Sequence, residues 1–531
     1  MSLKTLTGIL LVAALASCKK DKETNVSAET ETVANSISTT GATRAQLTMD
    51  SLFLYAKEVY LWNDVLPTYN VFNPRNYTTY GNGLTAFEKE LFDITQYKKN
   101  SSTGKPYEYY AADPTYPKYS YIEESETSGT TAYRPNALQT VSLEGVGYDF
   151  GLALSSVTAT DIRIRYVNPN SPADKAGLTR GDRIVSINNR TSRADSQTEV
   201  NFINNALESS SIIVKIEKTT GATVTHTLNK INYTTSPVMK TSVIENGAKK
   251  IGYIVFARFS NLSNAQTGLD NAFKTFATAG VTDLVVDLRY NGGGYVTTAE
   301  YLANLIAPAS TSGKVMYTEY YNAIMQADKA TILKNQPIYD SSNKLISYSS
   351  GVNGKFATYA DVDYSVSGNT YKFSKKGALE NLGTVCFIVS GSTASASELT
   401  LNALKPYMKV KLVGSTTYGK PVGFFGINID GYTVYMSNFQ SKNASGEGDY
   451  FNGLSVDISA TDDVTRDFGD IREVCLSKAI AYITSGTTLT ANTKMTLKNG
   501  ATVSSSEVTT QTLDNQSDFK GMVETRYKLK N

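Results

Sequence analysis

The chain has 531 residues, too many for one hydrophobic core, and this length predicts about three or four domains of roughly 100–200 residues each. Its 41% hydrophobic and 19% charged residues are typical of a globular protein, and 51 basic against 49 acidic residues leave a net charge of +2. That balance creates no strongly positive field, so nothing in the composition supports a nucleic-acid partner.

The first residues predict export from the cytoplasm. Lys4 precedes a short apolar run from Leu6 to Ala16. A membrane-spanning helix needs about 20 apolar residues, so the run is too short to span and predicts a signal peptide over residues 1–17. Cys18 follows Leu-Ala-Ser at the point where the apolar run ends, an arrangement that resembles a bacterial lipobox.

A lipobox implies that Cys18 is lipidated and anchors the protein to a membrane of the cell envelope. Several acyl chains on one residue suffice for stable anchoring. The expected location is the cell envelope, at the outer membrane, on its periplasmic or surface face. The alternative is an ordinary signal peptide with a chance cysteine. Residues 18–41 are rich in Ser, Thr, Glu and Ala and predict a flexible tether.

Residues 42–135 predict a small, mostly helical N-terminal domain with long loops. Apolar residues recur at helical spacing in LTMDSLFLYAKEVYLW, and a helix is expected to start at a cap formed by Asp50 or Ser51. Trp62 is the only tryptophan and is the expected core anchor of this domain.

Residues 136–235 switch to the alternating pattern of β-strands, as in DIRIRYV and SIIVKIEK. The segment SPADKAGLTRGDRIVSINN between them closely resembles the central pattern of PDZ domains. The resemblance implies a carboxylate-binding loop at Phe150, Gly151 and Leu152, where backbone N–H groups and an open strand edge would hold a peptide terminus. A structural β-domain without a ligand is the alternative.

The few metal-binding residue types give no indication of a metal site. His226 is the only histidine, and the alternation of TVTHTLNK places it on the same strand face as Val224 and Leu228. It is therefore expected to be a partly buried strand residue. Cys386 and Cys475 lie in apolar runs and are expected to be small buried hydrophobes, so neither a disulfide nor a metal site is predicted.

Residues 236–485 predict a domain of alternating strands and helices. Continuous apolar strands (IGYIVF, DLVVDL, TVCFIV, VKLVG) are separated by helical segments, with an irregular insertion over about 309–380. Residues 486–531 are a polar, Thr-, Ser- and Lys-rich segment to which the sequence assigns no role.

The stretch GSTASASELT, residues 391–400, follows one of these strands and opens a helix. Ser395 and Glu398 fit the S-x-x-E capping box, so a helix cap is the ordinary interpretation of this serine. The same position suits a nucleophile, because the small neighbouring residues leave space for a substrate and a helix N-terminus stabilises negative charge.

Two further motifs strengthen the catalytic interpretation. In DLRYNGGGY a strand runs into glycines 292–294, which can present backbone N–H groups to an oxyanion, although a flexible turn is the simpler alternative. In VKLVGSTTYGK a buried strand leads to Lys420, and a lysine can act as a base where burial disfavours its ammonium form. A loop lysine is more often a surface residue.

Together and in this order behind a PDZ-like module, these motifs resemble the C-terminal processing (tail-specific) serine peptidases. The matching segments are IGYIVFARFS, DLVVDLRYNGGG, STASASELTLNAL and LVGSTTYGK, and the later DYFNGLSVDISATDD resembles the family's substrate-side strand. The N-terminal SLFLYAKEVYLWNDVLP looks like that of lipoprotein members from Bacteroidetes-type bacteria. The resemblance covers the PDZ-like module and the catalytic domain.

The resemblance implies a mechanism without histidine. It assigns Ser395 as the nucleophile and Lys420 as the general base, with an oxyanion hole formed by Gly292, Gly293 and Ala396. Peptide or unfolded protein substrates would be hydrolysed through an acyl-enzyme, and the PDZ-like module would bind substrate or gate the site. No cofactor or metal is expected.

The sequence departs from the family at Phe424, where many members carry a glutamine that orients the lysine. The third catalytic residue is therefore left open, although an aromatic ring there could still desolvate Lys420. The alternatives are an inactive, peptide-binding envelope lipoprotein and, ranked lower, a ligand-binding scaffold like the retinoid-binding relatives. The oligomeric state is left open.

The expected fold is thus a multidomain α/β and α+β protein. It combines a small helical N-terminal domain, a PDZ-like β-rich domain and a βα catalytic domain resembling the ClpP and crotonase folds.

Overall fold

The computed structural model describes the chain from residue 37 to residue 530 with several gaps. The described residues are 37–124, 141–340, 344–487, 494–496, 502–504, 510–513, 520–524 and 526–530. The predicted signal peptide and Cys18 lie outside them.

The N-terminal region is helical, as predicted. Its elements are α2 (Arg44–Val59), η1 (Asn63–Val65), α3 (Tyr69–Phe72), η2 (Pro74–Tyr80), α4 (Leu84–Thr95) and β1 (Tyr121–Glu124). Helix α2 starts earlier than predicted, because Thr43 forms a capping box with Gln46. Asp50 lies inside the helix, where it is buried and pairs with Arg75 at 2.7 Å, so the expected cap at Asp50 or Ser51 is wrong.

Trp62 packs the N-terminal region against the predicted catalytic domain, residues 236–485. Its ring is buried, stacks on Tyr107 at 4.8 Å and lies 5.9 Å from the ring of Phe451. Strand β1 also pairs with β20 (Tyr432–Tyr435), which pairs with β19 (Ile427–Ile429) in a three-stranded sheet. The N-terminal region and the predicted catalytic domain therefore share both a core and a sheet.

The second region has the expected β-rich fold. Its elements are β2 (Val146–Asp149), β3 (Leu152–Thr158), β4 (Asp161–Val167), α5 (Pro172–Lys175), β5 (Arg183–Ile187), β6 (Arg190–Thr191), α6 (Gln197–Glu208), β7 (Ser211–Glu217), β8 (Thr223–Asn229) and β9 (Ile231–Thr234). The sheet runs β3-β4-β5-β7-β8, with all neighbours antiparallel. His226 is half-buried on β8 on the same face as Leu228, which confirms its prediction as a strand residue.

The third region is built around a six-stranded sheet of order β10-β11-β12-β16-β17-β22. Its strands are β10 (Val238–Asn246), β11 (Lys249–Phe256), β12 (Asp283–Asp287), β16 (Val385–Val389), β17 (Val410–Gly414) and β22 (Ile458–Ser459). Its helices are α7 (Leu262–Ala279), α8 (Val296–Ile306), α10 (Ala396–Leu404) and α11 (Val474–Ser485). All pairs except β10–β11 are parallel, as the βα pattern predicts.

The strands of this sheet are buried on both faces because alternate residues enter two different cores. Leu284 and Val286 of β12 pack with residues of α7, α8 and α10, whereas Val285 packs with residues of α11. Cys386 and Cys475 belong to the second core and are free, buried thiols, as predicted. The parallel strands end at one edge, where β12 leads to the glycine turn and β16 leads to Ser395.

The predicted irregular insertion contains short elements beside this edge. They are η3 (Ala309–Thr311), β14 (Val315–Tyr321), α9 (Ala323–Gln326), η4 (Thr331–Asn335), η5 (Tyr359–Asp361) and β15 (Thr370–Lys372). Strands β14 and β15 join β18 (Val422–Gly423) and β21 (Phe439–Asn443) in a second sheet of order β15-β14-β21-β18. The remaining strand of this part is β19 (Ile427–Ile429).

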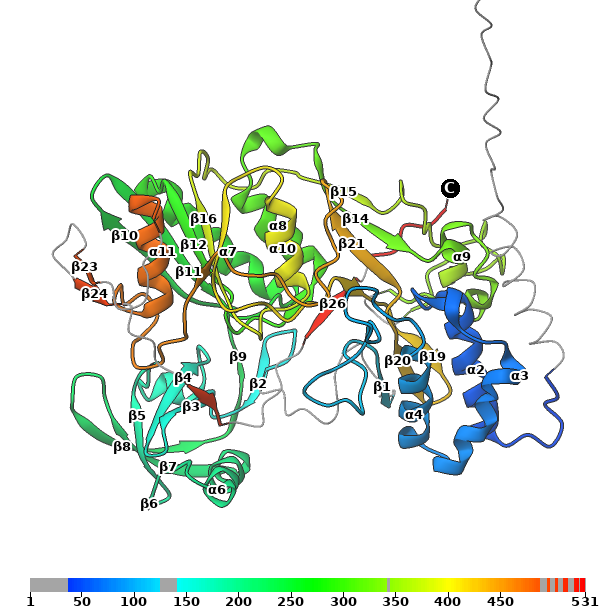
Figure 1. Ribbon diagram of the computed structural model, residues 1–531, viewed down its shortest axis with the longest axis horizontal. Helices are drawn as coiled ribbons and strands as arrows, with labels where there is room; N and C mark the ends of the chain where they lie inside the picture. The colour runs from blue at the N-terminus through cyan, green and yellow to red at the C-terminus, as the bar shows by residue number, and fades with distance from the viewer. Residues whose placement is uncertain are drawn as a thin grey trace, which may run out of the picture.

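The sequence assigned no role to the polar C-terminal segment. In the structure this segment forms strands that pair with the PDZ-like sheet and with the glycine turn. Its described strands are β23 (Lys494–Thr496), β24 (Thr502–Ser504), β25 (Gln511–Thr512) and β26 (Gly521–Val523). Strand β25 pairs with β3 of the PDZ-like sheet, and β26 pairs with β13 (Gly293–Tyr295) in the glycine turn. Figure 1 shows β26, in red, near the centre of the molecule.

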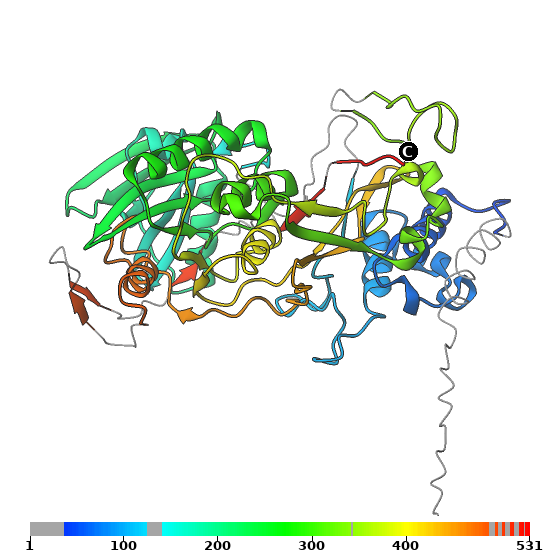
Figure 2. The same ribbon diagram turned by 90° about the horizontal axis from the view of Figure 1, so that it is seen from above.

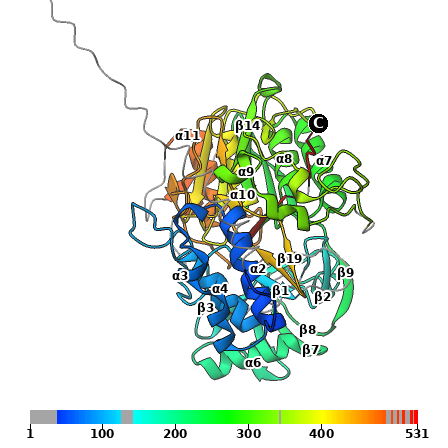
Figure 3. The same cartoon turned by 90° about the vertical axis from the view of Figure 1, so that its right-hand side faces the viewer.

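The figures show how the regions are arranged. The PDZ-like sheet lies beneath the six-stranded sheet in Figure 1. Figure 2 places the six-stranded sheet and helices α2–α4 at opposite ends of the long axis. Figure 3 views the molecule from the end at which the N-terminal helices lie. Within the described residues no helix is both long and apolar enough to cross a membrane.

Glu90 in α4 provides a test of the N-terminal core. It is fully buried, and neither carboxylate oxygen has a hydrogen-bond partner among the described residues. Burial raises the pKa of Glu90 well above its ordinary value, and the nearby Asp50 and Asp93 raise it further. The folded state therefore holds this proton more tightly than the unfolded state, so stability is lost as pH rises from about 4.5 through the folded pKa.

We predict that Glu90→Gln, which stays neutral, increases the melting temperature relative to the wild type by an amount that grows between pH 4 and pH 8. Each unit of pKa shift corresponds to about 1.4 kcal/mol. Thermal unfolding followed by circular dichroism measures the difference, with Glu208→Gln at an exposed position as the control. A difference that is the same at every pH would contradict a strongly raised pKa.

Candidate active site

Ser395 occupies the turn between strand β16 and helix α10. It is fully buried and has a φ of 61° and a ψ of −111°, a backbone conformation that non-glycine residues rarely adopt. Such strain costs about 1–3 kcal/mol and persists only where neighbouring contacts enforce it. Ser395 Oγ has no hydrogen-bond partner among the described residues. The hydroxyl is therefore not used to hold the fold together.

Glu398 enforces this conformation and joins it to the turn that carries Lys420. Oε2 of Glu398 accepts hydrogen bonds from the backbone N–H of Ser395 and from that of Lys420, each at 2.8 Å. Oε1 accepts from the Gly419 N–H at 2.8 Å and from Thr417 Oγ1 at 2.5 Å. Residues 25 positions apart in the chain are thus held against a single carboxylate oxygen.

The four hydrogen bonds stabilise a carboxylate that has no solvent contact. Burial raises the pKa of Glu398, while the hydrogen bonds from Thr417, Lys420, Ser395 and Gly419 oppose that rise. Of the capping box expected at this helix, the hydrogen bond from the Ser395 N–H to the Glu398 side chain is present. Its glutamate also reaches the lysine turn, a contact that the local S-x-x-E pattern does not predict.

Lys420 is fully buried, and its amine lies between aromatic rings. Nζ is 4.5 Å from the ring centre of Phe424 and 5.9 Å from that of Tyr119, and it donates to the backbone carbonyl of Lys520 at 2.9 Å. Phe424, at the position where a glutamine is common in the resembling family, therefore contacts the amine through its ring. The face of such a ring attracts a cation, whereas burial of the amine disfavours one.

The glycine turn is tied to the N-terminus of α10 by Asn291. Its side chain donates to the carbonyl of Phe256 at 2.8 Å and accepts from the Gly293 N–H at 2.9 Å. Its carbonyl accepts from the Ala394 N–H at 3.1 Å. The Gly293 N–H, one of the expected oxyanion-hole donors, is therefore bound to Asn291 in this structure.

Arg289 fixes the strand end that precedes the turn. This fully buried guanidinium pairs with Asp287 and Glu473, each at 2.8 Å, and with Asp462 at 2.7 Å. Burial alone would raise the pKa of Asp462, but Arg180 and Arg289 hold it well below its ordinary value. The network leaves little freedom to the turn that follows.

Gly293 brings the turn, the helix and the C-terminal segment to one point. A Cβ atom at this residue would lie 3.0 Å from the Ala396 nitrogen and 2.4 Å from the Gly521 carbonyl oxygen. With a φ of 107°, the position also suits glycine conformationally. The structure thus brings together Ser395, Ala396, Lys420 and the glycine turn. The carbonyl of Gly292 accepts from the Gly521 N–H at 3.1 Å.

The predicted peptide-binding loop lies in the PDZ-like region, on different elements. The Gly151 N–H donates to Asp149 at 2.6 Å, and Leu152 starts β3. Phe150 and Leu152 are buried in the same apolar cluster as Leu513 of the C-terminal segment. The edge of β3, where a peptide was expected, is paired with β25.

Sequence reasoning missed the contribution of the N-terminal region to this site. The Tyr119 hydroxyl donates to the carbonyl of Gly419 at 2.6 Å. Burial lowers the pKa of Lys118 to about 8, Glu398 opposes this shift, and the charge of Lys520 adds to it. These residues follow a loop-rich segment without a motif, so no sequence signal indicated them.

No described group of His, Cys, Asp and Glu side chains has the arrangement of a metal site. The buried ionisable groups around Ser395 include the carboxylate of Glu398 and the amine of Lys420. Such a pair of hydroxyl and shielded amine suits acyl transfer, in which the amine accepts the proton of the hydroxyl.

Comparison with known families agrees with this arrangement. Residues 250–459 match the model of peptidase family S41, and residues 163–218 match the PDZ domain. The first match contains the glycine turn, Ser395, Glu398 and Lys420. The second lies within the region predicted to be PDZ-like.

Curated relatives include C-terminal processing peptidases. A chloroplastic C-terminal processing peptidase of Tetradesmus obliquus is 24% identical over 346 residues, which are 63% of this chain and 63% of that protein. The carboxy-terminal processing protease CtpA of Bacillus subtilis is 24% identical over 325 residues, 60% of this chain and 56% of that protein. The chain thus spans less than two thirds of the length of these relatives.

A solved structure shares the fold. The crystal structure of a candidate S41 protease from Bacteroides fragilis superposes with a TM-score of 0.50 at 21% identity, covering 82% of this chain and 97% of that one. The predicted fold, with a helical N-terminal region, a PDZ-like domain and a βα domain, is confirmed.

We predict that Glu398→Gln loosens the lysine turn. The NH2 group of a glutamine cannot accept hydrogen bonds, so the donors facing one of the two oxygens lose their partner at a cost of about 1–3 kcal/mol. Hydrogen–deuterium exchange should show the amides of Gly419 and Lys420 exchanging about 5- to 150-fold faster.

Thr417→Ser is the matched control, because it keeps the hydroxyl that donates to the same carboxylate. Its exchange rates should remain near those of the wild type. Unchanged protection in Glu398→Gln would mean that the carboxylate does not hold the turn.

Proposed function

We propose that the chain belongs to peptidase family S41 through its catalytic domain, and that it is a serine endopeptidase that cleaves peptide or unfolded protein substrates with a Ser395–Lys420 dyad. One observation carries the proposal. The backbone nitrogens of Ser395 and Lys420 donate to the same oxygen of Glu398, and this holds the nucleophile and the base on facing turns.

The proposed reaction begins with proton transfer from Ser395 Oγ to the neutral amine of Lys420. Oγ then attacks the carbonyl carbon of the substrate, and the tetrahedral oxyanion faces the N–H of Ala396 and N–H groups of the glycine turn at 292–293. Each such donor stabilises the transition state by about 3 kcal/mol. The hydrogen bond between Gly293 and Asn291 must lengthen if the Gly293 N–H is to contribute.

The intermediate collapses as the amine of Lys420 returns the proton to the leaving nitrogen. The peptide C–N bond breaks, and an ester between Ser395 and the acyl half of the substrate remains. Water, deprotonated by the same amine, hydrolyses the ester and restores the hydroxyl. Every proton is supplied and recovered by the dyad, so the reaction needs no histidine.

The surroundings of the amine support its role as a base. The lack of solvent exposure disfavours an ammonium at Lys420, although the faces of the Phe424 and Tyr119 rings would attract a cation. Glu398 is the positioning residue, because its contacts are with backbone nitrogens rather than with the reacting atoms. A third catalytic side chain at the position of Phe424 is not part of this mechanism.

A second candidate function is peptide binding without turnover. It is favoured by one observation, the hydrogen bond from the amine of Lys420 to the Lys520 carbonyl, which occupies the base. In that case the protein would be an envelope lipoprotein that holds peptides at its PDZ domain and at the glycine turn. Turnover by the isolated protein separates the two candidates.

We also propose that Cys18 anchors the mature protein by lipid to the cell envelope. The support is the short apolar run that ends in Leu-Ala-Ser-Cys and the polar segment that follows it. The anchor would place the peptidase next to exported and unfolded envelope proteins.

We predict that Ser395→Ala and Lys420→Met both abolish cleavage of a casein-type unfolded substrate, by at least about 10³-fold. A fluorophosphonate probe should label the wild type at Ser395 and label neither variant. Lys118→Met is the informative comparison, because Lys118 is a second amine near the site whose pKa is lowered to about 8.

Retained labelling in Lys118→Met together with its loss in Lys420→Met identifies the base. The reverse pattern would move the base to Lys118. Equal cleavage by the wild type and Ser395→Ala would refute the peptidase and leave the binding function.

For the anchor, we predict that metabolic labelling with an alkyne fatty acid marks the wild type and is lost in Cys18→Ala. Fractionation should move the variant from the membrane to the soluble fraction, because the acyl chains supply the membrane affinity. Persistent label in Cys18→Ala would contradict lipidation at this residue.

A further inference from the structure

The C-terminal segment contacts both modules of the proposed peptidase. Its residues Gln511–Thr512 extend the PDZ sheet as β25, and Gly521–Val523 pair with the glycine turn as β26. The sequence pattern predicts no role for this segment. Its two described strands, one on the PDZ sheet and one at the site, lie where a bound peptide is expected.

We propose that this segment is an intramolecular ligand that occupies the substrate groove, so that the free enzyme is self-inhibited and the position of Met522 marks a subsite for an apolar substrate side chain. The inference rests on the proposed peptidase function. It identifies the substrate class as extended chains with an unbranched apolar residue at that subsite.

Strand β26 lies between the two halves of the candidate active site. It pairs in parallel with β13, with Gly521 opposite Gly293, and Val523 forms a parallel bridge with Phe424. One neighbour carries the glycine turn, and the other lies four residues after Lys420. An extended chain held there by backbone hydrogen bonds is the arrangement by which a peptidase binds substrates of varied sequence.

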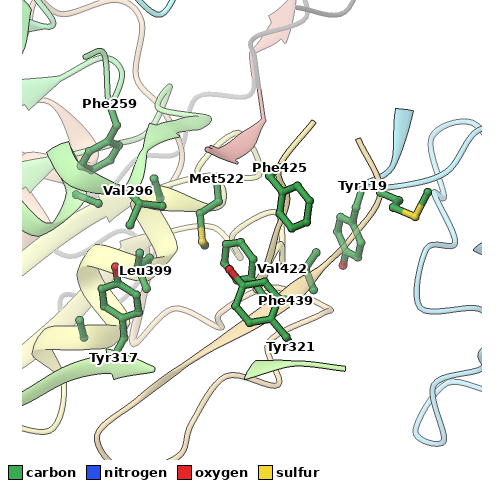
Figure 4. Close-up of a cluster of buried hydrophobic side chains, with 14 of the residues drawn as sticks. Tyr119, Phe259, Val296, Tyr317, Tyr321, Leu399, Val422, Phe425, Phe439 and Met522 are labelled. Atoms are coloured by element: carbon green, nitrogen blue, oxygen red, sulfur yellow. The ribbon is translucent and has the colours of Figure 1, made fainter. Parts of the chain in front are cut away.

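The side chain of Met522 fills an apolar site. It is fully buried in the main core cluster, and Figure 4 shows it between Val296 and Phe425 with Phe439 nearby. Methionine is flexible and adapts to irregular apolar surroundings. A substrate side chain entering the same place would therefore be apolar and unbranched, whereas a charged one would lose its hydration without a partner.

The backbone of the segment engages the catalytic groups directly. The Lys520 carbonyl accepts from Lys420 Nζ at 2.9 Å. The Gly521 carbonyl oxygen lies 2.4 Å from the point where a Cβ of Gly293 would be, and the Ala396 nitrogen lies 3.0 Å from the same point. A substrate cannot reach Ser395 and the expected oxyanion donors while the segment remains in place.

A second anchor is the PDZ domain. The Leu513 N–H donates to the carbonyl of Leu154 at 3.2 Å, and the Leu513 side chain is buried with Phe150 and Leu152. A strand added to a sheet edge with an apolar residue in the core beside it is how such domains hold peptides. The same segment thus fills both peptide-binding places.

Beyond the site, Arg526 fixes the segment to the catalytic domain. Its guanidinium contacts both oxygens of Glu300, at 2.9 and 3.0 Å, and pairs with Glu524 at 2.6 Å. Release of the segment therefore requires a competing peptide or a change in the segment itself.

The test uses the full mature chain with Met522→Asp, which places a charge in the apolar subsite. We expect the fluorophosphonate probe to label Ser395 at least fivefold faster than in the wild type, with a matching rise in peptide cleavage. Lys528→Gln, which removes one positive charge from an exposed position of the same segment, is the control and should stay within twofold of the wild type.

A peptide with the sequence DFKGMVETR, added to the Met522→Asp enzyme, should restore inhibition, and DFKGDVETR should not. Cleavage profiles of the variant should favour Met over Asp at one substrate position. Equal labelling of the wild type and Met522→Asp, with none in Ser395→Ala, would overturn the inference and leave the peptidase intact.

If neither the wild type nor Met522→Asp is labelled by the probe or cleaves substrate, the proposed function fails. Hydrogen exchange then tests whether the segment is bound as an intramolecular ligand. Amides of Gly521–Val523 that are protected in the wild type and exposed in Met522→Asp support an intramolecular ligand, and equal exchange in both refutes it. Should Met522→Asp not fold, Gly521→Pro replaces it, because it removes the N–H that donates to Gly292 without placing a charge in the core.

Discussion

The carboxylate of Glu398 is the contact on which the candidate site depends. It is fully buried and carries four hydrogen bonds, two of which join the backbone of Ser395 to that of Lys420. A buried carboxylate without such donors would be costly, and unpaired backbone N–H groups would be as well. The carboxylate and the two turns therefore stabilise one another, and the unusual backbone angles of Ser395 are held by the same contact.

The other half of the site is fixed by a separate set of charges. Arg289 is held by three carboxylates at the end of β12, and Asn291 then ties the glycine turn to the residues before Ser395. The parallel sheet brings the ends of β12 and β16 to one edge. The site is therefore assembled once the turn that follows each strand is held in place. The strand order of the sheet thus places the glycine turn beside Ser395, and the hydrogen bonds of Glu398, Arg289 and Asn291 hold these turns in place.

Much of this arrangement could be predicted because it is local in the sequence. The apolar strands, the S-x-x-E cap and the three glycines each have a pattern of short range, and the PDZ segment has a long specific one. Contacts between distant segments could not be predicted. The reach of Glu398 to Gly419, the Tyr119 hydroxyl on the lysine turn and the course of Gly521–Val523 depend on how whole domains pack. The early start of α2 was missed because Thr43 and Gln46 form a cap before the apolar pattern begins.

The central claim is that the hydroxyl of Ser395 and the amine of Lys420 act as one unit on the frame that Glu398 provides. A crystal structure of the protein after reaction with a peptidyl phosphonate tests it most directly. The account predicts phosphorus bonded to Ser395 Oγ, its oxygen facing the Ala396 N–H, and the Lys420 amine turned from the Lys520 carbonyl toward Oγ. Phosphorus on another residue, or an amine that stays on the Lys520 carbonyl in the adduct, would contradict it.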